Sequence, residues 1–220
     1  MSKTQLLYML LIFVLCGSVS PINPINTVKA QDAVTVQTTD TTSIQVPVSE
    51  KLRRLPVQDG GRIKPYDSFA REVLKLIYGK ETFQGKSAEN IIFTWMIIPD
   101  HWDKTPFVQV RHNGLREALK LDKDKTQVYY SPKELFENER IGLLIQELHT
   151  KVQAQEKLNP YFQAVQTLEN QLSLYHALKM REALRVAPSV VGDRWQSVAE
   201  LNGELKIRFE AVIKAFVQVI

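Results

Sequence analysis

The sequence predicts a mainly α-helical protein, a helical bundle with a long antiparallel helical hairpin and a few short β-strands. Apolar residues recur at three- and four-residue spacing over most of the chain after residue 50, which is the pattern of amphipathic helices. Residue pairs that start helices, such as Ser131-Pro132 and Asn159-Pro160, precede the longest of these stretches. Strand-like alternation is confined to a few short segments.

The composition fits one globular domain, or at most two small ones, and excludes several protein classes. The chain has 220 residues, 44% of them hydrophobic and 24% charged, unlike collagen, a wholly disordered tail or a polytopic membrane protein. Its formal charge is +4, but residues 1–30 hold two lysines and no acidic residue, so 26 basic and 24 acidic residues remain after them. This near balance does not favour nucleic acid as a partner. The single cysteine, Cys16, also lies in residues 1–30, so the rest of the chain can form no internal disulfide.

Residues 1–30 resemble a secretory signal peptide. Lys3 precedes an apolar run of 11 residues, Leu6 to Cys16, which is too short to cross a bilayer as a helix. We expect cleavage after Ala30, and an uncleaved anchor is the alternative. Either outcome exports the remainder of the chain, so we expect a periplasmic protein, in association with the inner membrane if the anchor is retained.

Residues 31–50 are predicted to be a flexible linker, and residues 51–220 a helical periplasmic domain. The linker is rich in threonine, serine and glutamine and contains no aromatic residue. Such a composition cannot bury enough apolar surface to order itself.

The helical domain begins with a predicted hairpin and helix. Asp59-Gly60-Gly61 is a turn signal, and the short stretches on either side can pair as two strands. Lys64-Pro65 then leads into a helix that we expect Asp67 to cap and Gly79 to end. The apolar stripe of this helix is predicted to be Phe69, Val73, Leu76 and Ile77.

The next predicted helix is capped by Ser87 and stops at Pro99. Its run from Ile91 to Ile98 is apolar on nearly all sides, which indicates a central, buried helix. Residues 99–103 are expected to form a loop after it.

Residues 106–130 are predicted to contain two short strands around a short helix. The strands are Phe107–Val110 and Gln127–Tyr130, Asn113-Gly114 is expected to turn, and the helix covers Leu115–Leu121.

The long hairpin is the clearest local prediction. Ser131, Pro132 and Glu134 combine a helix cap, a first-turn proline and a capping-box glutamate. Asn159-Pro160 starts the second helix, and two long helices with a short connection pack antiparallel. The two matching stripes are Ile141, Ile145, Leu148 and Val152 in the first helix, and Val165, Leu168, Leu172 and Tyr175 in the second.

The C-terminal part combines an extended segment with a final amphipathic helix. Leu184 to Pro188 leaves the hairpin in an extended form. The apolar stripe of the last helix is predicted to be Leu205, Phe209, Ile213 and Phe216.

The sequence contains no recognised catalytic or cofactor motif. G-x-S-x-G, Walker and G-x-G-x-x-G motifs and the C-x-x-C-H motif of covalent haem attachment are all missing. His149 and His176 fall too far apart on the hairpin helices to share one iron. His101 in the 99–103 segment can be a lone axial haem ligand, but a helix stop anchored by a tryptophan explains it better, because no second ligand lies at a recognisable spacing. We therefore expect no catalytic, cofactor-binding or metal residue in this chain.

A basic cluster surrounds the first turn. Acidic neighbours such as Asp59, Asp67 and Glu72 offset it, so it is either a solvated face or a docking surface for an anionic partner, lipid headgroups or haem propionates. Its members are Lys51, Arg53, Arg54, Arg62, Lys64 and Arg71.

The segment from Leu55 to Glu72 resembles the periplasmic region of system II cytochrome c biogenesis proteins of the CcsA/ResC type, particularly their large fused forms. The apolar helix ending Pro99–Trp102 and the segment Leu184–Pro188 followed by Trp195-Gln196-Ser197 match in character, so the resemblance covers roughly residues 50–210. The signature residues are Gln58, Asp59, Gly60, Gly61, Arg62, Lys64 and Pro65.

The resemblance implies a role in moving haem across the membrane and attaching it to apocytochrome c. In that family the chemistry belongs to a multi-span membrane domain with a tryptophan-rich motif, whereas Trp95, Trp102 and Trp195 are isolated here. No haem-binding or catalytic residue is therefore carried over to this chain. What is implied is a non-enzymatic accessory domain whose partners are membrane-embedded haem ligation proteins and apocytochrome c, with haem reached through a partner.

The signature has a physical interpretation as a structural or docking motif. Gly60-Gly61 permits a tight turn, Pro65 fixes the entry into the helix, and Arg62 and Arg71 can clamp Asp59 or Asp67. Three alternatives stay open: a periplasmic haem-binding module, a secreted hydrolase whose site forms only in three dimensions, and a domain cut from a longer gene without independent activity.

Overall fold

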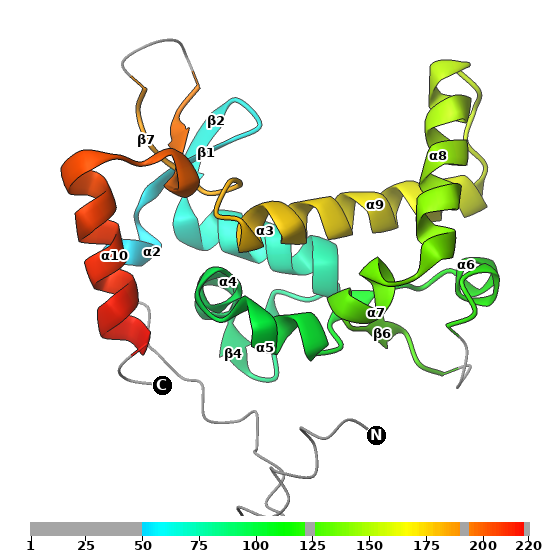
Figure 1. Ribbon diagram of the computed structural model, residues 1–220, viewed down its shortest axis with the longest axis horizontal. Coiled ribbons are helices and arrows are strands. Elements are labelled where there is room, and N and C mark those ends of the chain that lie inside the picture. Colours follow the sequence, from blue (N-terminus) through cyan, green and yellow to red (C-terminus); the bar gives the residue numbers. More distant parts are fainter. Residues whose placement is uncertain (1–49, 122–125, 190–193, 218–220) are drawn as a thin grey trace, which may run out of the picture. The chain divides into compact units, whose positions relative to one another are not determined.

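The computed structural model describes residues 50–121, 126–189 and 194–217, with side chains placed as far as residue 214. The predicted mainly α-helical fold is confirmed, with short antiparallel strand pairs between the helices (Figure 1). The predicted signal peptide and residues 31–49 of the predicted linker lie outside the described residues. Glu50, the last residue of that linker, already begins a helix.

The predicted hairpin and its following helix open the described chain. They are α2 (Glu50–Arg53), β1 (Pro56–Asp59), β2 (Arg62–Pro65) and α3 (Tyr66–Tyr78). Gly79 ends α3 in a left-handed conformation, as predicted. The predicted cap at Asp67 is wrong, because Pro65 takes the cap position and Asp67 lies inside the first turn. Leu76 is 43% exposed, because the buried face of α3 is centred on Ala70 and Leu74.

The central buried helix is confirmed as α4 (Ala88–Ile97), which follows the paired strands β3 (Thr82–Phe83) and β4 (Lys86–Ser87). Ser87 occupies the predicted cap position but its hydroxyl accepts no capping hydrogen bond. Pro99 does more than stop α4: it is the first residue of α5 (Pro99–Lys104), so the predicted loop is a helix.

The segment after α5 forms β5 (Val108–Gln109), α6 (Asn113–Ala118) and β6 (Tyr129–Tyr130). The two predicted strands pair with each other, Val108 opposite Tyr130. The predicted turn at Asn113-Gly114 is wrong, because His112 accepts a hydrogen bond from the Leu115 N–H and makes these residues the first turn of α6.

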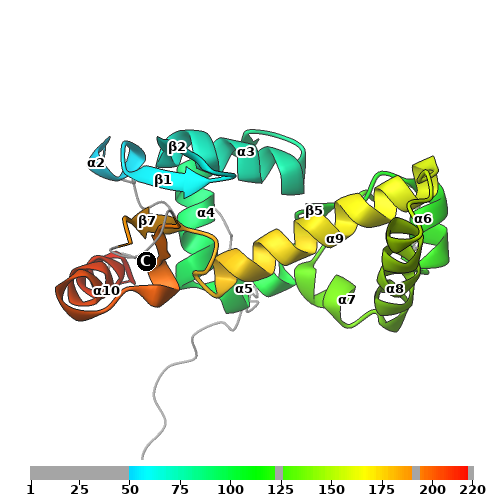
Figure 2. The same cartoon turned by 90° about the horizontal axis from the view of Figure 1, so that it is seen from above.

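The long hairpin consists of α8 (Glu139–Gln153) and α9 (Pro160–Lys179), preceded by the short α7 (Pro132–Phe136). Ser131 and Asn159 cap α7 and α9 as predicted, but Asn138 starts α8 as a separate helix. Figures 1 and 2 show α8 crossing α9 steeply, and Figure 1 shows α8 extending past it. This overhang explains why Val152, near the end of α8, is 47% exposed.

The C-terminal elements pack partly against the hairpin of β1 and β2. They are β7 (Arg185–Ala187), β8 (Gln196–Ser197), the 3-10 turn η2 (Val198–Glu200) and α10 (Gly203–Val217). In the predicted stripe of α10, Phe209 packs against the core whereas Leu205 is 52% exposed, and the side chain of Phe216 lies outside the described residues.

The core is aromatic where α4, α5 and α9 meet. The rings of Trp95 and Phe107 stack at 4.7 Å between centroids, and Trp102 meets Trp95 edge-on at 6.2 Å. The Tyr175 hydroxyl donates to Asp103 at 2.9 Å. The last of these contacts joins residues 72 positions apart in the sequence. Across the described part of the chain, no helix is both long enough and apolar enough to span a membrane.

Candidate functional site

The predicted signature forms a hairpin anchored at the N-terminal end of α3. The two strands pair in full register, from Asp59 opposite Arg62 to Pro56 opposite Pro65. Gly60 and Gly61 make the turn with φ values of +55° and +77°, which L-residues with a side chain adopt only at a cost. Val57 is fully buried, and the Tyr66 N–H donates to the Leu55 carbonyl at 2.8 Å. The hairpin is therefore attached to the helical body.

Lys64 joins the hairpin to the outer face of α3. Its Nζ lies 2.9 Å from Asp59 Oδ2 and 2.6 Å from Glu72 Oε2. The hydrogen bond to Glu72, and then the one to Asp59, raises the pKa of the Lys64 ammonium above its ordinary value. From the sequence, an arginine was the expected ion-pair partner of Asp59. In the structure that partner is Lys64.

A second ionic group closes the base of the hairpin. Arg71 Nη2 lies 3.0 Å from Asp67 Oδ2, which is one of the predicted clamps. Arg53 reaches Asp67 Oδ1 at 3.7 Å and places its Nε 3.1 Å from Glu89 Oε1. Glu89 is only 6% exposed, and a buried carboxylate needs such a cation beside it. Asp67 thus joins two arginines in place of capping α3.

One hydrogen bond ties the hairpin to the C-terminal segment. Gln58 Oε1 accepts from the backbone N–H of Trp195 at 2.7 Å, across 137 positions of the sequence. Sequence reasoning did not find this contact, because nothing in the local pattern of either segment indicates the other. The only indication of a link was that both segments resemble the same protein family.

The tip of the hairpin is the exposed part of the signature. Ile63 is 62% exposed, and Arg62 is exposed beside it. Among the residues that the structure describes, no carboxylate lies within ion-pair distance of Arg62. The signature therefore divides into a tightly bonded base and a tip that presents one cation and one apolar side chain to solvent.

The histidines are placed separately and have local roles. His149 Nε2 lies 2.6 Å from Glu169 Oε1 on the facing helix. His176 makes an edge contact with Phe136. The Nε2 atom of His101 is buried and has no hydrogen-bond partner among the residues that the structure describes, and its ring packs edge-on against Trp102. Within the described ranges, no three histidine, cysteine, aspartate or glutamate side chains gather as metal ligands.

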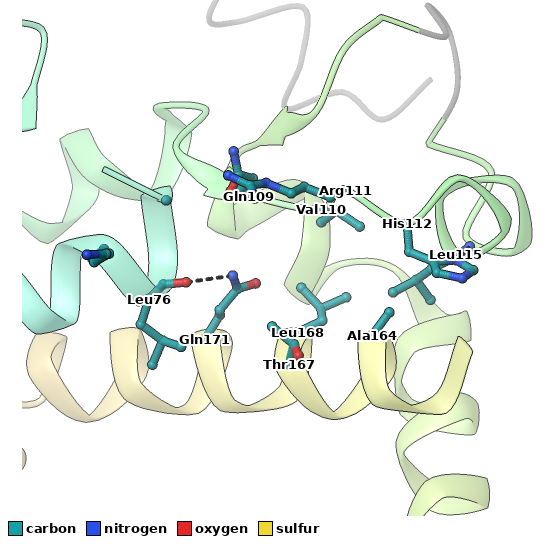
Figure 3. Close-up of a pocket in the computed structure, with 12 residues that line it drawn as sticks. Leu76, Gln109, Val110, Arg111, His112, Leu115, Ala164, Thr167, Leu168 and Gln171 are labelled. Carbon is teal, nitrogen blue, oxygen red and sulfur yellow. Dashed lines mark hydrogen bonds between the residues drawn. The ribbon is translucent and has the colours of Figure 1, made fainter. Parts of the chain in front are cut away.

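The structure also forms a hollow that the sequence did not predict. It lies at the other end of α3, between that helix, the segment from Gln109 to Leu115 and α9 (Figure 3). A weak signal for it exists in Arg111-His112, two adjacent basic residues between a strand and a helix.

Comparison with curated proteins finds a similarity over part of the chain. The chain is similar to Protein NrfI of Wolinella succinogenes, with 30% identity over 59 residues. These residues make up 27% of this chain and 6% of NrfI, so the chain corresponds to a small part of that protein's length. No protein-family model matches the chain.

Proposed function

We propose that the chain is an accessory component of cytochrome c biogenesis that works outside the cytoplasm through protein contacts, without catalysis of its own. Two likenesses support this role. One is the similarity to NrfI, a cytochrome c nitrite reductase biogenesis protein. The other is the resemblance of Leu55–Glu72 to the periplasmic region of CcsA/ResC-type proteins. The partners in this proposal are membrane-embedded haem ligation proteins, with apocytochrome c as a second partner and haem held by the membrane protein.

The observation that carries the proposal is the division of the hairpin into a fixed base and a free tip. Lys64 holds the base to α3 through Glu72, and Gln58 holds it to the C-terminal segment at Trp195. A contact surface held in one conformation loses little entropy when a partner binds. Ile63 is exposed, and Arg62, the preceding residue of the strand, has no carboxylate partner among the described residues; together they offer apolar burial and charge recognition, and arginine is favoured at protein interfaces.

The proposal is tested by co-purification with the membrane-embedded partner. We expect the variant Arg62→Glu/Ile63→Asp to reduce partner recovery at least fivefold, because it places two negative charges where the contact needs a cation and an apolar group. Both side chains are exposed, so the variant should keep the wild-type far-UV circular dichroism and unfolding midpoint.

The matched control is Lys157→Glu, a charge reversal at an exposed position in the connection between α8 and α9. It should leave recovery unchanged. Equal recovery for the hairpin variant and this control would remove the docking role from the tip.

Haem titration separates the contact proposal from direct haem binding by the chain. We expect haem added to the purified protein to give no Soret shift that depends on His101, because the Nε2 atom of that ring is buried. A shift that is present in the wild type and lost in His101→Ala would replace the contact proposal with a haem-binding module.

A further inference from the structure

The hollow at the C-terminal end of α3 has a volume of about 430 Å³, which is within the range of small-molecule sites. Figure 3 shows Gln171, Leu168 and Ala164 rising from α9 toward Val110, Arg111 and His112 on the opposite side. One wall is mainly apolar and the other carries charge. The remaining lining residues include Lys75, Leu76, Gly79, Gln109, Leu115 and Thr167.

Gly79 makes room for the polar wall. A Cβ atom at this position would lie 2.3 Å from Gln109 Oε1 and 3.1 Å from Arg111 Nη2. Real Cβ atoms do not approach other atoms as closely as the first of these distances. The absent side chain therefore allows the Gln109 amide and the Arg111 guanidinium to lie against the end of α3.

The charge of the hollow is that of one unpaired cation. Lys75 Nζ is already 3.1 Å from Glu81 Oε1. Arg111 has no carboxylate within ion-pair distance in the described part of the chain. His112 Nδ1 accepts the Leu115 N–H at 3.2 Å and its ring lies against Tyr161, at the other end of the hollow from the Arg111 guanidinium (Figure 3). The guanidinium fork of Arg111 by itself matches a singly charged carboxylate.

Gln171 supplies an unused acceptor. It is 3% exposed, and its Nε2 donates to the Leu76 carbonyl at 2.8 Å, one of the free carbonyls at the end of α3. Its Oε1 is buried and has no hydrogen-bond partner in the described residues. A buried acceptor without a donor is costly, and a ligand N–H or O–H in the hollow would satisfy it. Leu76, Val110 and Leu168 line the space between this acceptor and the cation.

We propose that this hollow binds a small amphipathic monocarboxylate that carries one N–H or O–H donor. Arg111 holds the carboxylate, the apolar lining covers the body of the ligand, and Gln171 Oε1 accepts from its donor. The site is separate from the hairpin, so this inference stands independently of the proposed function.

Three probes of similar size test each part of the proposal on the full chain. Indole-3-acetate has the carboxylate, the apolar ring and an N–H donor. 1-Naphthaleneacetate keeps the first two and lacks the donor, and tryptamine replaces the anion with a cation. By calorimetric titration, we expect saturable binding of indole-3-acetate, weaker binding of 1-naphthaleneacetate by roughly threefold to tenfold, and no binding of tryptamine.

Two variants assign the binding to the hollow. Arg111→Gln should weaken indole-3-acetate binding by about tenfold or more, since it removes a charge-assisted hydrogen bond. The control Arg54→Gln removes an exposed arginine that pairs with Glu50 and should leave affinity unchanged. Gln171→Leu should abolish the preference for the ligand with the donor. If that variant does not fold, the comparison of the two carboxylates on the wild type still tests the acceptor.

Several results would overturn the proposal. These are no saturable binding of either carboxylate, equal affinity for indole-3-acetate and tryptamine, and an unchanged affinity in Arg111→Gln. If Arg111 only complemented the negative C-terminal end of α3, Arg111→Gln would lower the free energy of unfolding but leave the relative affinities for the three probes unchanged. That result would also overturn the proposal.

Discussion

The two ends of α3 differ in how completely their polar groups are paired. At the N-terminal end, Lys64 bridges Asp59 and Glu72, and Asp67 lies between Arg53 and Arg71. At the C-terminal end, Arg111 has no carboxylate partner and Gln171 Oε1 has no donor among the described residues. Both ends carry basic side chains, so charge alone does not distinguish them. They differ in whether these polar groups already have partners within the described part of the protein.

This difference indicates what each end is suited to do. Mutual pairing at the hairpin base uses up the hydrogen-bonding capacity of its charges, which leaves them a structural role and leaves the tip for contact. Unused capacity beside a hollow is what a ligand site requires, because the missing partners can be supplied from outside. The following changes test the contrast, from the largest expected effect to the smallest.

The largest effect is expected at the ligand end, from Gly79→Ala. Alanine would be strained at the φ of +84°, and its Cβ, placed 2.3 Å from Gln109 Oε1, would displace the end of that flexible side chain, so we expect a loss of about 1.5–3 kcal/mol in the free energy of unfolding. Urea denaturation measures it. Gly85→Ala is the matched control, since Gly85 has a φ of +78° with nothing within 4 Å; it should lose only about 1–2 kcal/mol. Equal losses would show that Gly79 is needed for its backbone conformation alone.

An intermediate effect is expected from Tyr66→Phe at the hairpin end. The Tyr66 hydroxyl is fully buried and donates to the Glu89 carbonyl at 2.9 Å, and burial raises its pKa well above the usual value. Removing the hydroxyl leaves that carbonyl without this donor and should cost about 1–1.5 kcal/mol in the free energy of unfolding. Partner recovery should not change. A loss of recovery would mean that the body of α3, and not only the tip, takes part in docking.

The smallest effect is expected from Lys64→Met, because its ion pairs are near the surface. We expect a loss of about 0.3–1 kcal/mol that diminishes at high salt. The pKa of Lys64 is raised by folding, so its contribution is complete below the ordinary lysine pKa of about 10.4 and is lost as pH rises through the higher folded value. The difference between wild type and variant should therefore be constant from about pH 7 to pH 9 and shrink at strongly alkaline pH. A difference that persists there would assign the effect to packing of the lysine stem.

Local signals in the sequence predicted most of the fold and the position of the hairpin. Ser131 and Asn159 cap helices as expected, and the apolar run from Ile91 to Ile98 lies in the central helix. The errors occur where two local signals compete. Asn113-Gly114 looks like a turn, but the His112 side chain provides a cap for α6, and Asn138 divides a stretch that looked like one long helix.

The candidate sites were predicted less well than the fold. The residues of the signature were identified by resemblance, but their partners were not. The ion-pair partner of Asp59 is Lys64, where Arg62 was expected, and Gln58 accepts a hydrogen bond from the backbone of Trp195. The hollow was missed entirely because its polar groups come from three separate segments of the chain.

The sequence by itself determined most of the helices, the caps at Ser131 and Asn159 and the glycine turn, because these depend on side-chain spacing and backbone preferences within a few residues. The tertiary structure alone decided which charges neutralise each other and which remain available. Ion pairs and cavities depend on distances between segments that are remote along the chain. The orphan acceptor of Gln171 exists only because α9 packs across the end of α3.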